Sequence, residues 1–118
     1  MSAPAKVGTI SAETQYHLGS GLGSRVSTLM IQFESQSFTG EVSILSRTQR
    51  GGDDSDSDVD RTLLTQYYTD EQTGDGADTA AITGNKSIRV DASGKEIYAD
   101  CTSLATGSLD FTAIPLLG

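Results

Sequence analysis

The chain has 118 residues, of which 36% are hydrophobic and 6% aromatic with no Trp, so it has room for one modest core and not for two domains. Sixteen Asp and Glu against eight Lys and Arg give a formal net charge of -8, which argues against nucleic-acid and anionic-membrane partners because both are negatively charged. A single cysteine excludes a disulfide within the chain, and no apolar run approaches the roughly 20 residues of a membrane span.

The N-terminal region is interpreted as an extended arm over residues 1–10, followed by a single domain over residues 11–118. Pro4 lies in the arm, and alternating apolar residues within 7–18 predict a first strand. Three glycines with serine neighbours between 19 and 23 then indicate a flexible connector. Without a disulfide or a signal-peptide pattern, we expect the chain to be made and assembled in a reducing cytoplasm.

The central part of the chain predicts three strands and one long polar loop. Apolar residues at every second position mark strands over 27–33 and 40–46, with a turn over 34–39 between them. Residues 47–60 contain no periodic apolar residues, so we expect a long loop there. A strand over 61–69 follows this loop.

The last part of the chain begins with a second long polar connection over 70–84, which carries a short strand near 80–82. Three strands that alternate apolar and polar residues follow at 87–91, 96–102 and 108–114. Ser93-Gly94 and Thr106-Gly107 have turn chemistry, so the three strands are predicted to form a closing meander.

The strand pattern determines the expected fold class. Each strand has one apolar and one polar face, so its apolar face must be covered by a second sheet. We therefore predict an all-β fold: a single antiparallel β-sandwich, jelly-roll-like, with about seven or eight strands, two long polar loops and an extended N-terminal arm.

The acidic loop is the strongest candidate for a metal site. Alternate carboxylates can converge on a hard cation, which makes Asp54, Asp56 and Asp58 candidate Ca²⁺ ligands. An EF-hand is excluded, because counting from Asp54 the sixth position is Val59 instead of Gly and the twelfth is Thr65 instead of Glu. A solvated acidic loop without a cofactor is the interpretation we favour, and an irregular Ca²⁺ site stays the alternative.

Catalytic residues are not expected. His17 is the only histidine, which excludes a multi-histidine metal site and makes this residue the required member of any Ser-His-Asp arrangement. Asp91, Asp100 and Asp110 lie on neighbouring predicted strands and suggest a glycosidase pair, but Asp100 and Asp110 fall on polar faces, where solvated carboxylates are ordinary. We interpret His17 as a surface or interface residue and the chain as no enzyme.

Three further residues are interpreted through the strand pattern. Cys101 takes an inward position of a strand, so we expect a small core residue instead of a reactive thiol. Tyr67 and Tyr68 suggest a platform for stacking sugars, but adjacent strand residues point to opposite faces. One of the two tyrosines is therefore expected in the core.

Four short motifs carry a resemblance to a known group of proteins. They are TGEVSI at 39–44, SIRVDASG at 87–94, IYAD at 97–100 and TGSLDFTA at 106–113. With these motifs the chain resembles small virion proteins of tailed bacteriophages, over roughly residues 26 to 115. The resemblance implies a β-sandwich protein of a phage head, tail or fibre.

Within this group the chain is most similar to capsid decoration, or cement, proteins. That resemblance implies a partner in the major capsid protein, self-association as a trimer or dimer, and a place on the capsid surface of the virion after assembly in the host cytoplasm. Lys6, Val7, Ile10, Arg25 and Arg89 are the candidates for contacts with the shell or with neighbouring subunits. The arm would add a strand to a neighbour's sheet.

Two other functions stay open from the sequence. One is a tail, baseplate or fibre component of a virion, and the other is a small carbohydrate- or calcium-binding adhesion module.

Overall fold

The computed structural model of the protein describes residues 5–47, 63–74, 76 and 78–117. These residues form an all-β fold without a helix, and the predicted antiparallel, sandwich-like class is confirmed. Its seven strands are β1 (Lys6–Ile10), β2 (Gln15–Ser20), β3 (Val26–Arg47), β4 (Leu64–Thr65), β5 (Thr69–Asp70), β6 (Lys86–Asp91) and β7 (Glu96–Leu117). They belong to one sheet in which the paired strands run antiparallel.

The two longest strands, β3 and β7, pair with each other along nearly their whole length and organise the fold. Each has 22 residues, and each contains two of the strands predicted from the sequence. The predicted turns at 34–39 and at Thr106-Gly107 are wrong, because both segments are bends within a continuous pair. Ser37 and Gly107 lie at these bends with positive φ angles of 56° and 72°.

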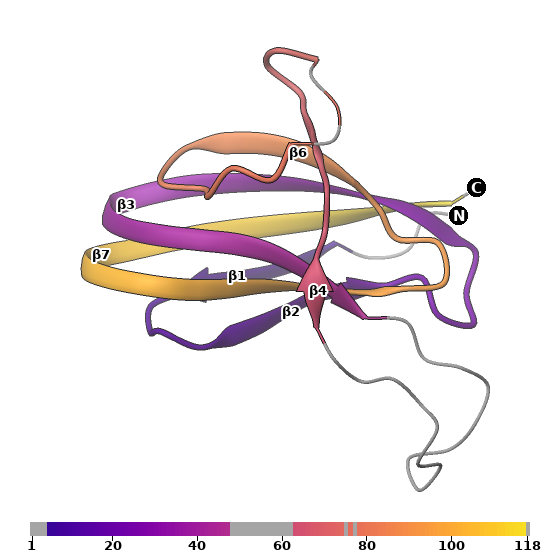
Figure 1. The fold of residues 1–118 in the computed structure, drawn as a ribbon, viewed down its shortest axis with the longest axis horizontal. Helices are drawn as coiled ribbons and strands as arrows, with labels where there is room; N and C mark the ends of the chain where they lie inside the picture. The colour runs from indigo at the N-terminus through magenta and orange to yellow at the C-terminus, as the bar shows by residue number, and fades with distance from the viewer. Residues whose placement is uncertain (1–4, 48–62, 75, 77, 118) are drawn as a thin grey trace, which may run out of the picture.

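Because β3 and β7 bend together, the sheet folds over itself into two layers (Figure 1). The five-strand layer contains β1, the C-terminal half of β7, the N-terminal half of β3, β6 and β5. The four-strand layer contains β2, the N-terminal half of β7, the C-terminal half of β3 and β4. Figure 1 shows both bends at one end of the molecule and the end of β7 at the opposite end.

The predicted closing meander is also wrong in its pairing. β6 pairs with β3 and β5, so β3 separates it from β7 within the layer. The tight turn at Ser93-Gly94 is confirmed: Gly94 has a φ of 67° between the end of β6 and the start of β7. A turn signal therefore correctly located the reversal but did not identify which strands become neighbours.

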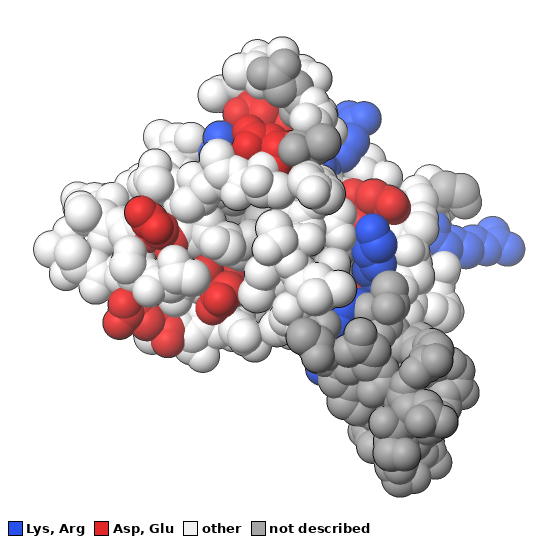
Figure 2. All heavy atoms as spheres, in the orientation of Figure 1, with Lys and Arg blue, Asp and Glu red and all other residues white. Residues whose placement is uncertain are grey.

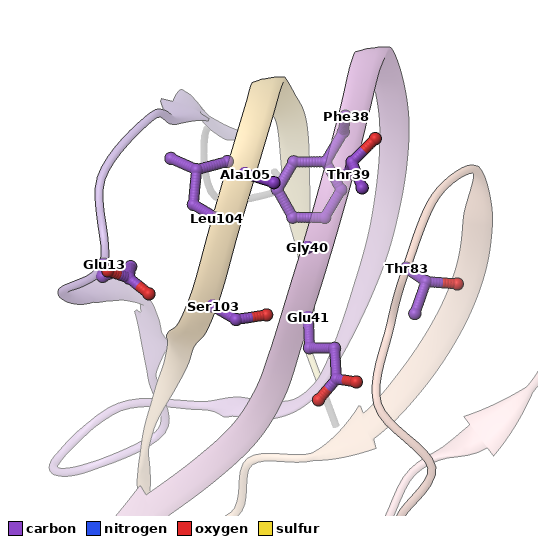
Figure 3. Close-up of a pocket in the computed structure, with 9 residues that line it drawn as sticks. All are labelled: Glu13, Phe38, Thr39, Gly40, Glu41, Thr83, Ser103, Leu104 and Ala105. Carbon is purple, nitrogen blue, oxygen red and sulfur yellow. The ribbon is translucent and has the colours of Figure 1, made fainter.

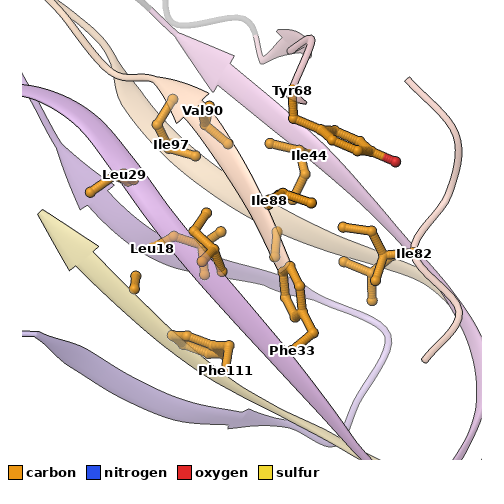
Figure 4. Packing of buried hydrophobic residues seen from close by; sticks show 14 of the residues in the cluster. Leu18, Leu29, Phe33, Ile44, Tyr68, Ile82, Ile88, Val90, Ile97 and Phe111 are labelled. Carbon is orange, nitrogen blue, oxygen red and sulfur yellow. The ribbon is translucent and has the colours of Figure 1, made fainter. Parts of the chain in front are cut away.

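The core lies between the two layers and is filled mainly by inward residues of β1, β2, β3, β6 and β7 (Figure 4). Ile31, Ile88 and Ile97, from β3, β6 and β7, are fully buried, and burial of one such side chain contributes about 1.5–3 kcal/mol. Cys101 is buried in the same cluster, as predicted, and burial raises the pKa of its thiol. Tyr68 is the core tyrosine of the adjacent pair.

The N-terminal segment differs from the predicted arm. Residues 6–10 form the edge strand β1, with Ile10 opposite Leu109 and completely buried. The predicted first strand over 7–18 is two strands, because the chain turns between them and the Tyr16 hydroxyl accepts hydrogen bonds from the backbone N–H groups of Ser11 and Ala12. The division into an arm over 1–10 and a domain over 11–118 therefore does not hold for residues 6–10.

Two of the three glycines in the predicted connector are packed more tightly than a flexible connector would be. Gly19 belongs to β2, and Gly21 forms a single bridge with Ser93. A Cβ atom at Gly21 would lie 1.9 Å from the carbonyl oxygen of Ala92. Close approach of two backbones, and not flexibility, explains this glycine.

The two predicted long connections have different outcomes. The loop over 47–60 lies, from residue 48 on, outside the described residues. In place of the strand over 61–69, the described part has only β4 and β5, and the short strand near 80–82 is a single bridge between Ile82 and Val42. The described part of this region pairs with β3 and β6 through two-residue strands and a single bridge.

Candidate functional site

The outer side of the five-strand layer carries apolar side chains that the core does not use. Met30 lies opposite Ile114 on one side and Arg89 on the other, and Leu116 follows opposite Thr28. Residues directly opposite in an antiparallel pair point to the same face. Because Leu29 and Ile31 point into the core, Met30 and its neighbours point outward.

Val7 of β1 completes this surface. It lies opposite Thr112, which lies opposite Gln32, and it is 70% exposed. Val7, Met30, Ile114 and Leu116 are named here the outer apolar face. It spans three hydrogen-bonded strands, β1, β7 and β3, so its backbone is rigid.

The residues predicted as contacts fall in three different environments. Val7 belongs to the outer apolar face, and Arg89 lies at the border of that face, where its Nε is 3.0 Å from an oxygen of Glu71. Lys6 and Arg25 are exposed, Arg25 in the connection between β2 and β3. The prediction for Ile10 is wrong, because an inward position on β1 makes it a core residue.

Three residues of this surface were missed by the sequence reasoning. Met30, Ile114 and Leu116 occupy polar-face positions of strands whose other face is apolar. An apolar residue at such a position breaks the alternation, and this was the available signal.

His17 connects the edges of the two layers. Lys6 Nζ of β1 donates a hydrogen bond to His17 Nδ1 over 3.0 Å, so the neutral ring carries its proton on Nε2, which faces Glu96 Oε1 at 3.7 Å. Burial, and then the nearby Lys6 ammonium, hold the pKa of His17 below its ordinary value. Tyr98 packs edge-on against the ring with 5.2 Å between centroids.

Arg47 extends this cluster across the four-strand layer. Its Nε lies 3.0 Å from Glu96 Oε2, and its guanidinium lies 5.4 Å from the centroid of the Tyr98 ring. The arrangement pairs charges and aromatic rings across strands, which favours a structural role for His17.

Acidic side chains gather at the end of the molecule that carries the bends. Glu34 and Asp110 face each other across β3 and β7, and Glu41 follows beyond the bend of β3. None of these three carboxylates forms an ion pair with a described Lys or Arg. Figure 2 shows acidic side chains toward this end and most of the visible Lys and Arg toward the other.

Two acidic residues at the end of β5 are neutralised by ion pairs with β6. Asp70 pairs with Lys86 at 3.1 Å, and Glu71 pairs with Arg89. The candidate Ca²⁺ ligands Asp54, Asp56 and Asp58 lie outside the described residues. Within the described part of the chain, no three His, Cys, Asp or Glu side chains are close enough to hold a metal ion.

Asp91 and Asp110, two of the three carboxylates considered for a glycosidase pair, lie far from each other. Asp91 lies opposite Thr28 and Asp110 opposite Glu34, so the two carboxylates are six residues apart along β3, or about 20 Å. Asp110 accepts a hydrogen bond from the Thr9 hydroxyl at 2.8 Å. The two carboxylates are therefore too far apart to work on one bond.

A groove with a volume of about 550 Å³ lies at the bends. Figure 3 shows Glu13 and Glu41 on either side of Ser103, with Phe38 and Leu104 nearer to the bends of β3 and β7. A Cβ atom at Gly40 in this groove would lie 2.3 Å from the carbonyl oxygen of Ser103. The lining of the groove thus combines two acidic residues with apolar side chains.

A second groove lies between β6 and the segment that carries β4 and β5, with a volume of about 370 Å³. Its lining residues are Gln66, Tyr67, Tyr68, Thr69, Arg89, Asp91 and Lys95.

The described residues contain no helix long and apolar enough to cross a membrane.

The comparisons with known proteins identify a shared fold. No family model and no curated protein matches the chain. The crystal structure of the SPBc2 prophage-derived protein YomS is similar with a TM-score of 0.63, covering 95% of this chain and 92% of that chain at 11% sequence identity. The chain shares its fold with a prophage-derived protein. At this identity the likeness concerns the fold alone, so roles of individual residues are not transferred.

Proposed function

We propose that the chain is a non-enzymatic structural component of a bacteriophage virion, a capsid decoration protein that binds the outer head shell and stabilises it. The observation that carries the proposal is the outer apolar face, a rigid sheet surface with an apolar residue on each of its three strands. The fold shared with the prophage-derived protein YomS supports a phage origin.

The chemistry of the outer apolar face suits a protein partner. Its apolar residues alternate with Thr28, Gln32 and Thr112, whose polar groups can hydrogen-bond across an interface. Arg89 at its border adds a planar donor for a carboxylate of the partner. The partner we propose is the major capsid protein, whose regular lattice repeats one contact many times and raises the overall affinity.

The acidic end suits the surface of a particle. Carboxylates without described cationic partners repel the same end of neighbouring particles and keep virions apart in solution. Self-association as a trimer or dimer on the shell would use remaining edges, such as the free edge of β1. The protein then works at the capsid surface of the virion, without a cofactor, after assembly in the host cytoplasm.

Co-sedimentation with expanded, undecorated capsids of the source phage tests the proposal. We expect the natural chain to saturate at a symmetry-defined number of copies per particle. Met30→Glu places a charge in the centre of the outer apolar face and should weaken binding at least about 10-fold. Leu45→Glu is the matched control, because Leu45 is also half-buried and lies on the outer side of the four-strand layer, opposite Tyr98.

Two results would overturn this assignment. If the natural chain does not sediment with capsids, the role in the head is wrong and a tail, baseplate or fibre component becomes the better proposal. If Met30→Glu binds as well as the natural chain, the outer apolar face is not the contact. Deletion of residues 2–10 is unsuitable as a test, because it removes β1 and the buried Ile10.

A calcium-binding adhesion module is separated by one further measurement. Ligands that bind only the folded state raise the melting temperature. If Asp54, Asp56 and Asp58 bind Ca²⁺, adding the ion stabilises the natural chain and not the variant with three Asn residues at these positions. If Ca²⁺ changes the melting temperature of neither chain, the result supports the solvated acidic loop.

A further inference from the structure

The groove beside β6 exposes an aromatic ring that the fold does not need for its core. Tyr67 is 59% exposed, whereas Tyr68 next to it is 3% exposed. Adjacent residues of an extended chain point to opposite sides, which explains this contrast. The Tyr67 ring therefore offers an apolar surface to a ligand at the wall of the groove.

The chain segment that carries Tyr67 is held in place on both sides. The Tyr68 hydroxyl donates a hydrogen bond to the carbonyl oxygen of Ala80 at 2.6 Å, and the backbone N–H of Gln66 donates to that of Ile44 at 2.9 Å. The backbones of Tyr68 and Asp78 exchange two further hydrogen bonds. The groove is thus formed before any ligand arrives, which reduces the entropic cost of binding.

Polar groups line the groove near this ring. Lys95 Nζ lies 3.3 Å from Gln66 Oε1 and 3.7 Å from Asp91 Oδ2. The Asp91 side chain is 64% exposed, and its Oδ1 accepts one hydrogen bond, from the backbone N–H of Ser93. A carboxylate has about four acceptor positions, so Asp91 retains free ones beside the ammonium donor.

We propose that this groove binds a pyranose sugar through two neighbouring hydroxyl groups. A hydroxyl both donates and accepts, so one hydroxyl can donate to Asp91 while the next accepts from Lys95. The C–H face of the sugar ring would pack on Tyr67. The ligand class follows from an exposed ring, a free acceptor and an adjacent donor within one preformed groove.

This proposal goes beyond the role on the capsid and does not depend on it. Tyr67, Asp91 and Lys95 are not part of the outer apolar face, although Arg89 borders both surfaces. Sugar binding is measured on the isolated chain, and decoration is measured on capsids. Failure of one proposal therefore leaves the other intact.

The test is an NMR titration of the full ¹⁵N-labelled chain with glucose, galactose, mannose and N-acetylglucosamine, each to about 20 mM because single sugars bind weakly. We expect at least one sugar to shift amide signals confined to residues 66–69 and 89–95. Tyr67→Ala should weaken that binding about 10-fold, and Tyr67→Phe should keep it because stacking needs only the ring. Asp91→Asn should also weaken it.

Leu64→Ala is the matched control, since Leu64 has the same exposed fraction as Tyr67, 59%, and does not line the groove. Its sugar affinity should equal that of the natural chain. The proposal is wrong if none of the four sugars shifts the amide signals of the groove residues. That result is expected if the groove binds a segment of another protein and not a sugar. It is equally wrong if Tyr67→Ala binds as tightly as the natural chain.

Discussion

Alanine at Gly107 should destabilise the protein far more than alanine at Gly94, although both glycines have a left-handed backbone. Their φ angles are 72° and 67°. A Cβ atom at Gly107 would lie 2.2 Å from the carbonyl oxygen of Ser37 and 2.4 Å from its carbon, whereas nothing lies within 4 Å of a Cβ atom at Gly94. The pair of variants therefore separates backbone conformation from crowding at the bend.

The expected magnitudes follow from these contacts. In both variants the left-handed backbone of an alanine lowers the unfolding free energy by about 1–2 kcal/mol. Alanine also restricts the unfolded chain, which restores about 0.4–1 kcal/mol. The net loss for Gly94→Ala is about 1 kcal/mol. At Gly107 the Ser37 carbonyl must also move by about 1 Å within a paired backbone, which adds about 2 kcal/mol.

Urea unfolding, followed by circular dichroism at pH 7, measures both losses. We expect Gly107→Ala to lose about 3 kcal/mol of unfolding free energy. The difference of about 2 kcal/mol from Gly94→Ala corresponds to a melting temperature about 8 °C below that of Gly94→Ala. Equal losses for the two variants would refute the reasoning, because they would show that the backbones of β3 and β7 do not meet at the bend.

The remaining predictions concern pH and the core. Burial and Lys6 lower the pKa of His17, so the histidine of the unfolded state takes up its proton at a higher pH than that of the folded state. The unfolding free energy should therefore fall as the pH drops from 7.5 through 6.5 toward 5. His17→Gln should reduce this pH dependence, as measured by urea titrations. Ile88→Ala, at a fully buried position, should cost about 2–5 kcal/mol of unfolding free energy, against less than about 0.5 kcal/mol for exposed Leu64→Ala. A backbone hydrogen bond and a lysine lower the pKa of Asp70. The carboxylate therefore contributes to folding stability above its ordinary pKa of 3.8, and this contribution is lost as the pH falls below that value. Asp70→Asn should reduce the loss of stability on acidification below pH 4.

Sequence alternation located the segments of β3, β6 and β7 well, but not the short strands β4 and β5 or the connections between strands. The pattern that predicted strands over 27–33 and 40–46 reports which residues are buried on one face, and the structure buries Ile31 and Ile44 accordingly. The same pattern cannot distinguish two strands joined by a turn from one strand that bends. Both give an interval of polar residues between two alternating runs.

The proposed contact surface could be predicted only in part. Val7 was predicted as a contact and is part of the outer apolar face, and Arg89 was predicted as a contact and borders it, but Met30 and Ile114 were assigned to no function. Their role depends on register, since Ile114 meets Met30 only because β7 pairs with β3 in one alignment. Ile10 was misassigned because residues at a chain end were assumed to be free.

The sequence by itself determined an all-β chain with one core, one cysteine inside it and a strongly acidic surface, because alternation and charge are local properties of the residues. The sequence predicted a turn at both Gly94 and Gly107, and only the tertiary structure decided that Gly107 bends the chain instead of reversing it. The two glycines have nearly the same φ, and the difference comes from the neighbour: Gly107 lies against the backbone of Ser37, and Gly94 faces open space. Pairing over about 70 residues of sequence separation folds the sheet into two layers.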